Sequence, residues 1–290
     1  MTKAVIEGGG EPVGLDDQAD ALVWLAPWDA EALRAAVAAT SPRWVQLSSA
    51  GVERMAEAGV LDDKRVWTCA KGSYAQPVAE HALMLALAGL RVLPQRVTAR
   101  SWGQPAGESL FDADVTILGA GGIAAVLLQL LHPFRVRATV VRRGQEPVPG
   151  AARTLPMTGL TEALTGAKVV FLALALTPQT TGIIGAAELA AMRADGWLVN
   201  VARGRHVQTD ALVAALDAGT IAGAALDVTD PEPLPDGHPL WGHPRCIITP
   251  HTADTIEMVI PMLAARVRDN VALFAAGRTL EGLVDPAAGY

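Results

Sequence analysis

Three side chains in the second half of the chain could carry out acid–base chemistry together: Arg203, a carboxylate from Asp227 or Glu232, and His251. Each follows an apolar run that we expect to form a buried strand, because such runs without alternation are typical of strands covered on both faces. Ligands of open α/β sheets bind outside the carboxyl ends of the strands. We therefore expect the three side chains to meet at one edge of a parallel sheet.

These side chains suit the reduction of a 2-keto acid. A histidine donates a proton near neutral pH, and a carboxylate near His251, from Asp227 or Glu232, would orient the ring and stabilise its charged form. The Arg203 guanidinium can grip a substrate carboxylate and polarise the adjacent keto group. The reaction also needs a hydride, which protein side chains do not supply, so a cofactor is expected.

A glycine-rich turn in the middle of the chain indicates that cofactor. A short apolar strand, 115–118, runs into Gly-Ala-Gly-Gly-Ile-Ala and then into an apolar helical stretch, 125–131. In this context Gly119 permits the tight turn, and Gly121 lets the backbone approach a pyrophosphate. The helix would direct its free N–H groups and positive dipole end at the anion. The pattern predicts a dinucleotide-binding site.

Two arginines favour one dinucleotide over the other. Arg142 and Arg143 end the next expected strand, 138–141, roughly 20 residues after the first glycine, where an acid would bind the ribose hydroxyls of NAD. Guanidinium groups instead suit the 2′-phosphate of NADP. We predict NADP as the preferred cofactor, with NAD as the alternative if both arginines are only a solvated strand end.

Composition excludes several other classes of protein. The 290 residues are 51% hydrophobic and carry a net charge of −7, which disfavours binding to nucleic acid or to anionic membranes. The two cysteines do not make a disulfide framework, and we find no metal-ligand spacing. Residues 1–7 are interpreted as a first strand rather than a signal peptide. We expect a soluble, cytoplasmic protein without a membrane span.

Alternation of short strands and helices predicts an α/β fold with a parallel sheet. The expected helices are 29–39, 77–93, 209–218 and 255–276. The expected strands are 44–47, 65–68, 115–118, 138–141, 168–174, 197–201, 222–226 and 246–249. Because the glycine turn lies in mid-chain, we predict a dinucleotide-binding domain over 93–254, inserted into a discontinuous substrate domain over 1–92 and 255–290. A small substrate would bind in the cleft between two such domains.

Several motifs make the chain resemble the D-isomer-specific 2-hydroxyacid dehydrogenase family. Along the chain they are Val78-Ala-Glu-His81, Gly119-Ala-Gly-Gly-Ile-Ala124, Leu176-Thr-Pro-Gln-Thr-Thr-Gly182, Asn200-Val-Ala-Arg-Gly204, Leu226-Asp-Val228 with Glu232-Pro233, and Thr249-Pro-His251. The resemblance implies a Rossmann-type, doubly wound parallel sheet inserted into a smaller flavodoxin-like α/β substrate domain. It also implies a homodimer.

The resemblance further implies roles for individual residues. Arg203 would bind the keto acid, and His251, paired with Glu232, would be the acid–base group. Asp227 would contact the nicotinamide end of the cofactor. Further cofactor contacts are expected from Gly122, Ile123, Thr177 and Ala202. Two loops, 48–51 and 70–73, would cradle the substrate carboxylate, with contacts expected from Ser49, Ala50, Gly51, Lys71 and Gly72.

The leading hypothesis is an NADP-preferring reductase of a small 2-keto acid such as glyoxylate or hydroxypyruvate. One alternative is the NAD-linked oxidation of a small anion such as formate, which releases no hydroxyl proton and would leave the Glu232–His251 pair without a task. A second alternative is a dinucleotide-sensing binding protein with little turnover. His81, next to Glu80 on a long helix, is interpreted as a packing or hydrogen-bonding residue.

Overall fold

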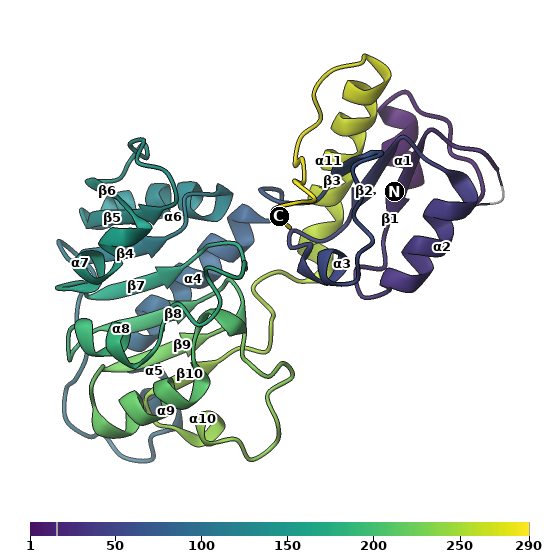
Figure 1. The fold of residues 1–290 in the computed structure, drawn as a ribbon. Helices are drawn as coiled ribbons and strands as arrows, with labels where there is room; N and C mark the ends of the chain where they lie inside the picture. Colours follow the sequence, from purple (N-terminus) through teal and green to yellow (C-terminus); the bar gives the residue numbers. More distant parts are fainter. Residues whose placement is uncertain (16, 290) are drawn as a thin grey trace. The chain divides into compact units, whose positions relative to one another are not determined.

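The computed structural model describes residues 1–15 and 17–289, and the chain divides into two compact units (Figure 1). The larger unit is Ala75–Asp254; the smaller combines Met1–Tyr74 with the chain from Thr255 onwards. The first boundary differs from the expected one at residue 92, because α4 (Ala75–Leu90) packs on strands of the larger unit.

The larger unit contains a sheet of seven parallel strands in the order β10-β9-β8-β7-β4-β5-β6. These strands are β4 (Asp114–Leu118), β5 (Arg137–Arg142), β6 (Arg153–Pro156), β7 (Val169–Leu172), β8 (Trp197–Asn200), β9 (Gly223–Leu226) and β10 (Cys246–Ile248). The chain runs outwards from β4 on one side and from β7 on the other. The predicted doubly wound parallel sheet is confirmed, although β6 is not among the predicted strands.

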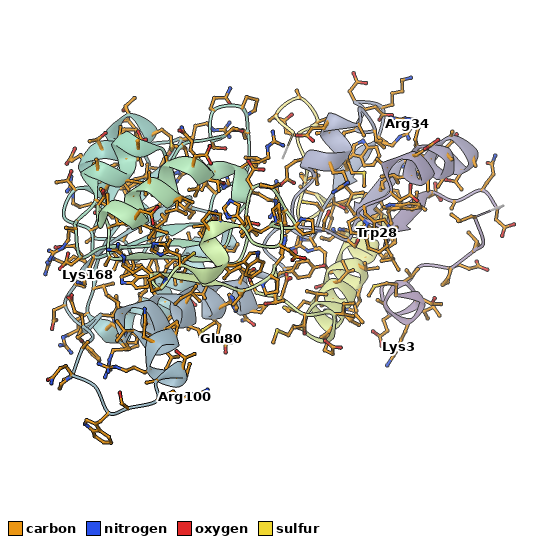
Figure 2. All side chains as sticks on the ribbon, turned by 90° about the horizontal axis from the view of Figure 1, so that it is seen from below. Lys3, Trp28, Arg34, Glu80, Arg100 and Lys168 are labelled. Atoms are coloured by element: carbon orange, nitrogen blue, oxygen red, sulfur yellow. The ribbon has the colours of Figure 1, made fainter. Side chains whose placement is uncertain are left out.

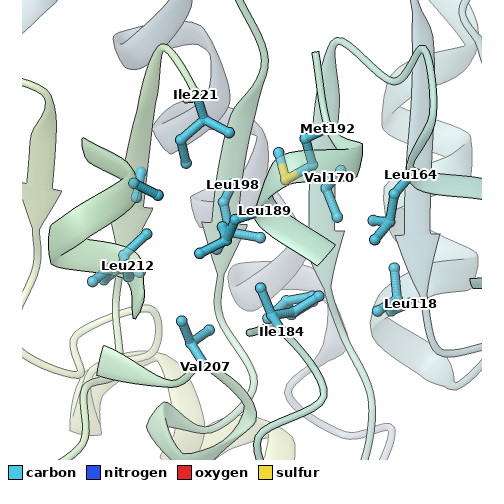
Figure 3. Close-up of a cluster of buried hydrophobic side chains, with 14 of the residues drawn as sticks. Leu118, Leu164, Val170, Ile184, Leu189, Met192, Leu198, Val207, Leu212 and Ile221 are labelled. Carbon is cyan, nitrogen blue, oxygen red and sulfur yellow. The ribbon is translucent and has the colours of Figure 1, made fainter. Parts of the chain in front are cut away.

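Helices cover both faces of this sheet. α4 packs against α6 (Gly122–Leu131), and on the other face the apolar side of α9 (Thr209–Ala218) joins the cluster of buried side chains in Figure 3. All side chains of β7 are fully buried, as expected for a strand covered on both faces. The shorter elements are α5 (Leu93–Thr98), α7 (Leu160–Leu164), α8 (Ala186–Ala191), α10 (Pro239–Gly242), η1 (His132–Phe134), η2 (Met157–Gly159) and η3 (Gly204–His206).

A buried lysine supports the edge of the sheet opposite the carboxyl ends of the strands. Lys168, labelled in Figure 2, precedes β7, and its side chain is only 8% exposed. Its ammonium group contacts Asp195 at 3.0 Å and also pairs with Glu108. Because a buried polar group without partners is costly, these two carboxylates offset the cost of burying the lysine side chain.

The smaller unit has a sheet of three parallel strands, β1 (Ala21–Trp24), β2 (Trp44–Leu47) and β3 (Val66–Thr68). Its helices are α1 (Thr2–Glu7), α2 (Ala30–Thr40), α3 (Glu53–Glu57) and α11 (Ile256–Ala275). Asp29 caps α2 by accepting a hydrogen bond of 2.8 Å from the Ala32 N–H, as its position in the sequence predicts. The strands predicted at 44–47 and 65–68 and the helix predicted at 255–276 are confirmed as β2, β3 and α11, whereas β1 was not predicted.

The prediction of a first strand at residues 1–7 is wrong, because this segment forms α1. Its residues include the good helix formers Lys3, Ala4 and Glu7, and Lys3 and Glu7 form an i,i+4 ion pair at 3.6 Å. Only Ala4 is buried, where α1 packs against α11. The segment therefore needs no pairing partner in the sheet.

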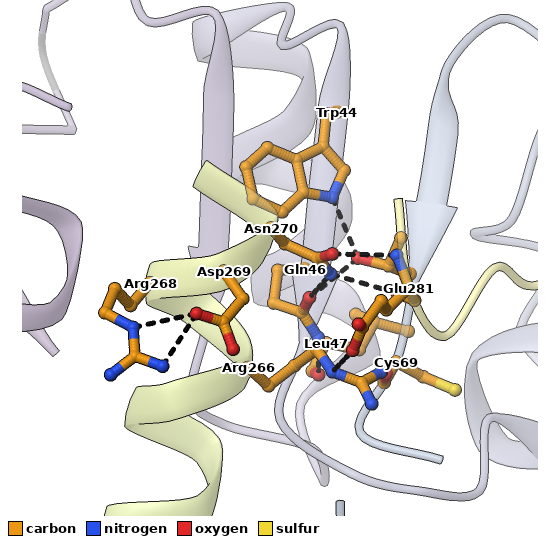
Figure 4. A network of polar contacts seen from close by, with 10 residues as sticks. Trp44, Gln46, Leu47, Cys69, Arg266, Arg268, Asp269, Asn270 and Glu281 are labelled. Atoms are coloured by element: carbon orange, nitrogen blue, oxygen red, sulfur yellow. Dashed lines mark hydrogen bonds and ion pairs between the residues drawn. The ribbon is translucent and has the colours of Figure 1, made fainter. Parts of the chain in front are cut away.

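A buried polar network joins β2 to the segment that follows α11 (Figure 4). Asn270 on α11 donates to the Gln46 side chain at 2.9 Å and to the Glu281 carbonyl at 2.9 Å, and it accepts from the Glu281 N–H at 2.8 Å. Thr68 donates to Gln46 and accepts from the Trp44 indole N–H, each at 2.8 Å. The side-chain amide of Asn270 therefore provides partners for polar groups that would otherwise be buried without them.

We expect Asn270→Ala to lower the free energy of unfolding of the smaller unit by about 2–4 kcal/mol, since it leaves several buried polar groups unpaired and opens a cavity. Denaturant unfolding, followed by hydrogen exchange of the β2 amides, measures the loss. Asp269→Asn is the matched control, because this neighbour on α11 pairs with the exposed Arg268 side chain and not with the Asn270 network among the residues that the structure describes. An Asn270→Ala protein as stable as the control would contradict this role.

Candidate active site

The glycine turn lies where the strand order reverses, between β4 and β7. Gly119 has φ +110°, and a side chain there would overlap the Ala173 carbonyl, so the turn requires glycine. α6 begins directly after Gly121, and a Cβ at Gly121 would meet no atom within 4 Å. The space before the first N–H groups of α6, including that of Ile123, is therefore open to an anion.

Arg142 is the last residue of β5, and exposed Arg143 follows it. The Arg142 guanidinium lies 3.5 Å from a Glu146 carboxylate oxygen and donates to the Glu146 carbonyl at 3.4 Å. Both arginines are thus at the carboxyl end of β5, next to the strand that carries the glycine turn.

The loop after β8 presents Arg203. Fully buried Asn200 accepts from the Ala202 N–H at 3.0 Å and donates to the Arg203 carbonyl at 2.9 Å, which fixes the turn. A Cβ at Gly204 would overlap the Thr229 carbonyl, so the loops after β8 and β9 are in direct contact. The sequence therefore needs glycine after Arg203.

Asp227, at the end of β9, is 2% exposed and accepts hydrogen bonds from the loop after β10. Its carboxylate accepts from the Thr249 hydroxyl at 2.7 Å and from the N–H groups of Thr252 and Ala253 at 2.9 and 3.1 Å. His81 lies 3.3 Å away. Burial alone would raise the pKa of Asp227, but these hydrogen bonds outweigh burial and lower the pKa.

His251 and Glu232 form a close pair. The Nδ1 of His251 lies 2.6 Å from a Glu232 carboxylate oxygen, and the other oxygen accepts from the Thr229 N–H at 3.3 Å. The His251 backbone has φ +52°, which is uncommon for this residue type, and its N–H donates to the Asp227 carbonyl at 2.7 Å. The pair leaves Nε2 as the ring atom that can exchange a proton with a ligand.

Charges couple this pair to Arg203. The hydrogen bond to Glu232 raises the pKa of His251, while burial and the positive charge of Arg203 oppose the rise. The hydrogen bond with His251 lowers the pKa of Glu232, and Arg203 contributes in the same direction. The structure thus brings together the three side chains that the sequence singled out, as one electrostatic cluster.

Two further groups lie near this cluster, and sequence reasoning missed one of them, Asp254. His81, on α4, hydrogen-bonds the Thr249 hydroxyl at 2.9 Å, which agrees with the hydrogen-bonding role expected for it and gives it a specific partner. Asp254 also interacts with the cluster: burial raises the pKa of its carboxyl, and the charges of His251 and Arg203 oppose that rise. The only sequence signal for Asp254 is its position three residues after His251.

The remaining expected cofactor residues lie on loops of the same unit. Thr177 follows β7, and its N–H donates to the Thr180 hydroxyl at 2.8 Å, which shapes that loop. Ala202 is buried in the turn before Arg203. Their contacts with a cofactor stay predictions.

The expected substrate loops lie in the smaller unit, after β2 and β3. Ala70 donates to the Ser49 carbonyl at 2.8 Å, and the Cys69 thiol donates to the Ala50 carbonyl at 3.4 Å, so the loops are held side by side. Gly51 is half-buried, while Lys71 and Gly72 are exposed, Gly72 with φ +83°. Substrate binding by these residues stays a prediction.

No helix within residues 1–15 and 17–289 has both the length and the apolar character needed to cross a membrane. Over the same residues, no group of three or more His, Cys, Asp or Glu side chains is placed to hold a metal ion.

Comparisons with known proteins identify relatives of the chain. A protein of Corynebacterium melassecola, described as an uncharacterized protein in the proB 3′ region, is 42% identical over 296 residues, covering 100% of this chain and 96% of its own. Glyoxylate/hydroxypyruvate reductase A of Yersinia enterocolitica is 35% identical over 177 residues, which are 61% of this chain and 56% of that protein.

A solved structure agrees over nearly the whole length. The D-isomer specific 2-hydroxyacid dehydrogenase of Xanthobacter autotrophicus Py2, determined in complex with NADPH and MES, superposes with a TM-score of 0.82 at 29% identity, covering 96% of this chain and 87% of that one. The family model described as D-isomer specific 2-hydroxyacid dehydrogenase, NAD binding domain, matches residues 81–253, more than half of the chain. The chain therefore belongs to the D-isomer-specific 2-hydroxyacid dehydrogenase family of NAD(P)-dependent oxidoreductases.

Proposed function

We propose that the protein reduces a small 2-keto acid, such as glyoxylate or hydroxypyruvate, to a D-2-hydroxy acid with NADPH as the preferred cofactor. The observation that carries this proposal is the His251–Glu232 pair at 2.6 Å, with the charge of Arg203 acting on both groups. Proton transfer to a keto oxygen needs such a pair, whereas oxidation of formate does not. The name of the Yersinia relative supports the choice of substrates.

The residues at the strand ends fit a phosphorylated dinucleotide. The open space before α6 suits a pyrophosphate, and Arg142 and Arg143 suit a 2′-phosphate. The Xanthobacter relative was solved with NADPH, which supports the same choice. When bound, the reduced nicotinamide supplies the hydride that the keto carbon accepts.

The protein's own groups would handle the charge and the proton. Arg203 would hold the substrate carboxylate and polarise the keto group, and Nε2 of protonated His251 would donate the proton to the keto oxygen. Glu232 stabilises the protonated ring and fixes its orientation through Nδ1. In the reverse direction neutral His251 would remove the hydroxyl proton.

We expect His251→Asn to lower kcat for glyoxylate or hydroxypyruvate reduction about 10²- to 10⁴-fold, because the proton donor is lost. The NADPH Kd, measured by fluorescence, should stay unchanged. His132→Asn, which alters an exposed histidine on η1, is the control. Unchanged turnover in His251→Asn would remove this residue from its proposed role and favour a sensor with incidental activity.

The Glu232–His251 bond predicts a shift in the pH profile. Reduction needs protonated His251, so kcat/KM falls as pH rises through the His251 pKa, which Glu232 raises. In Glu232→Gln that pKa drops towards its ordinary value, and the fall in kcat/KM should begin at lower pH. Asp236→Asn, an exposed acid on the same loop, controls for the change in net charge. A profile that is unmoved, or that moves to higher pH, would be incompatible with this pairing.

A further inference from the structure

The loop after β5 places a carboxylate against the arginine that ends this strand. A terminal nitrogen of Arg142 lies 3.5 Å from a Glu146 carboxylate oxygen, and the other terminal nitrogen donates to the Glu146 carbonyl at 3.4 Å. The Arg142 side chain is 34% exposed and the Glu146 side chain 75% exposed. The guanidinium is thus partly held by the protein, and its partner faces solvent.

Glycine at position 144 makes this contact possible. A Cβ on Gly144 would overlap the Glu146 carboxylate and would lie 3.5 Å from the Nε of Arg142. Gly144 is not among the residues with positive φ, so alanine can adopt its backbone conformation. The absence of a side chain at this position therefore lets the carboxylate fold back over the loop.

This contact lies at the point where the two dinucleotides differ. A 2′-phosphate carries negative charge and needs guanidinium donors, so it would compete with the Glu146 carboxylate for Arg142 and be repelled by it. A ribose 2′-hydroxyl has no charge and can donate a hydrogen bond to a carboxylate. The Glu146 side chain would thus weaken the binding of NADPH and leave the binding of NADH unchanged or stronger.

We propose that Glu146 is a specificity-determining residue that acts as an internal competitor of the 2′-phosphate for Arg142 and so limits the preference for NADPH over NADH. The inference rests on the proposed function, because it assumes that the 2′-phosphate binds at Arg142. Glu146 weakens NADPH binding without removing it, which keeps NADH usable.

The test measures the Kd of NADPH and of NADH by fluorescence, without substrate, at low ionic strength. In Glu146→Gln the Kd of NADPH should fall by about threefold to tenfold, the size expected of a single charge at a partly exposed site, while that of NADH falls by less than about twofold or rises. High salt should reduce the difference. Gly144→Ala retains every charge but displaces the Glu146 carboxylate, so it should also lower the Kd of NADPH relative to the Kd of NADH.

Glu162→Gln is the matched control, because Glu162 pairs with Arg153 at the start of β6, at the opposite end of the strands. Arg142→Ala tests the underlying assumption, and it should raise the Kd of NADPH about tenfold or more. If Arg142→Ala has no effect, the placement of the 2′-phosphate in the proposed function fails. If it has its effect but Glu146→Gln and Gly144→Ala leave the Kd ratio unchanged, or weaken NADPH binding, the inference about Glu146 is overturned and the proposed function stands.

Discussion

The position of the candidate acid–base group depends on one buried carboxylate. Asp227 is almost fully enclosed and receives hydrogen bonds from the Thr249 hydroxyl and from two N–H groups of the loop after β10. A buried charge that loses such partners destabilises a protein strongly, so the loop has little freedom to move away. His251 lies within this loop, and its own N–H donates to the Asp227 carbonyl. The unusual backbone conformation of His251 is held in place by these contacts.

Close packing of backbone brings the other groups to the same sheet edge. The turn at Gly119 touches the segment after β7, and the turn at Gly204 touches the segment after β9. Because all seven strands are parallel, their carboxyl ends lie along one edge. Arg142 ends β5 at this edge, and the loops after other strands carry Arg203, Glu232 and His251. The fold supplies the proximity, while Asn200 and Asp227 set the orientation of Arg203 and of the His251 loop.

Local patterns in the sequence were enough to predict the strands and helices whose own apolar residues place them in the core. The strands of the larger unit other than β6 are visible in the sequence as apolar runs, and α2, α9 and α11 begin or end at recognisable positions. β6 includes Arg153 and Pro156 and lies at the edge of the sheet, so its pattern is weak. Residues 1–7 contain a short apolar run, Ala4-Val5-Ile6, that suits a strand, but helix propensity and packing on α11 decide otherwise.

Contacts between distant residues explain what the sequence could not give. His81 and Thr249 are 168 positions apart, and nothing local to either predicts their hydrogen bond. The contact between Glu146 and Arg142 depends on how the β5–β6 loop folds around Gly144, and no local pattern in the sequence predicts it. The assignment of the two substrate loops, the homodimer and the cytoplasmic location expected from the sequence stay predictions.

The most direct measurement is the oxidation of NADPH and of NADH by the unaltered protein, in parallel, with glyoxylate, hydroxypyruvate and larger 2-keto acids as substrates. The account predicts turnover on at least one small 2-keto acid, with a higher kcat/KM for NADPH than for NADH. Tight binding of NADPH without turnover on any member of the panel would contradict the proposed reductase.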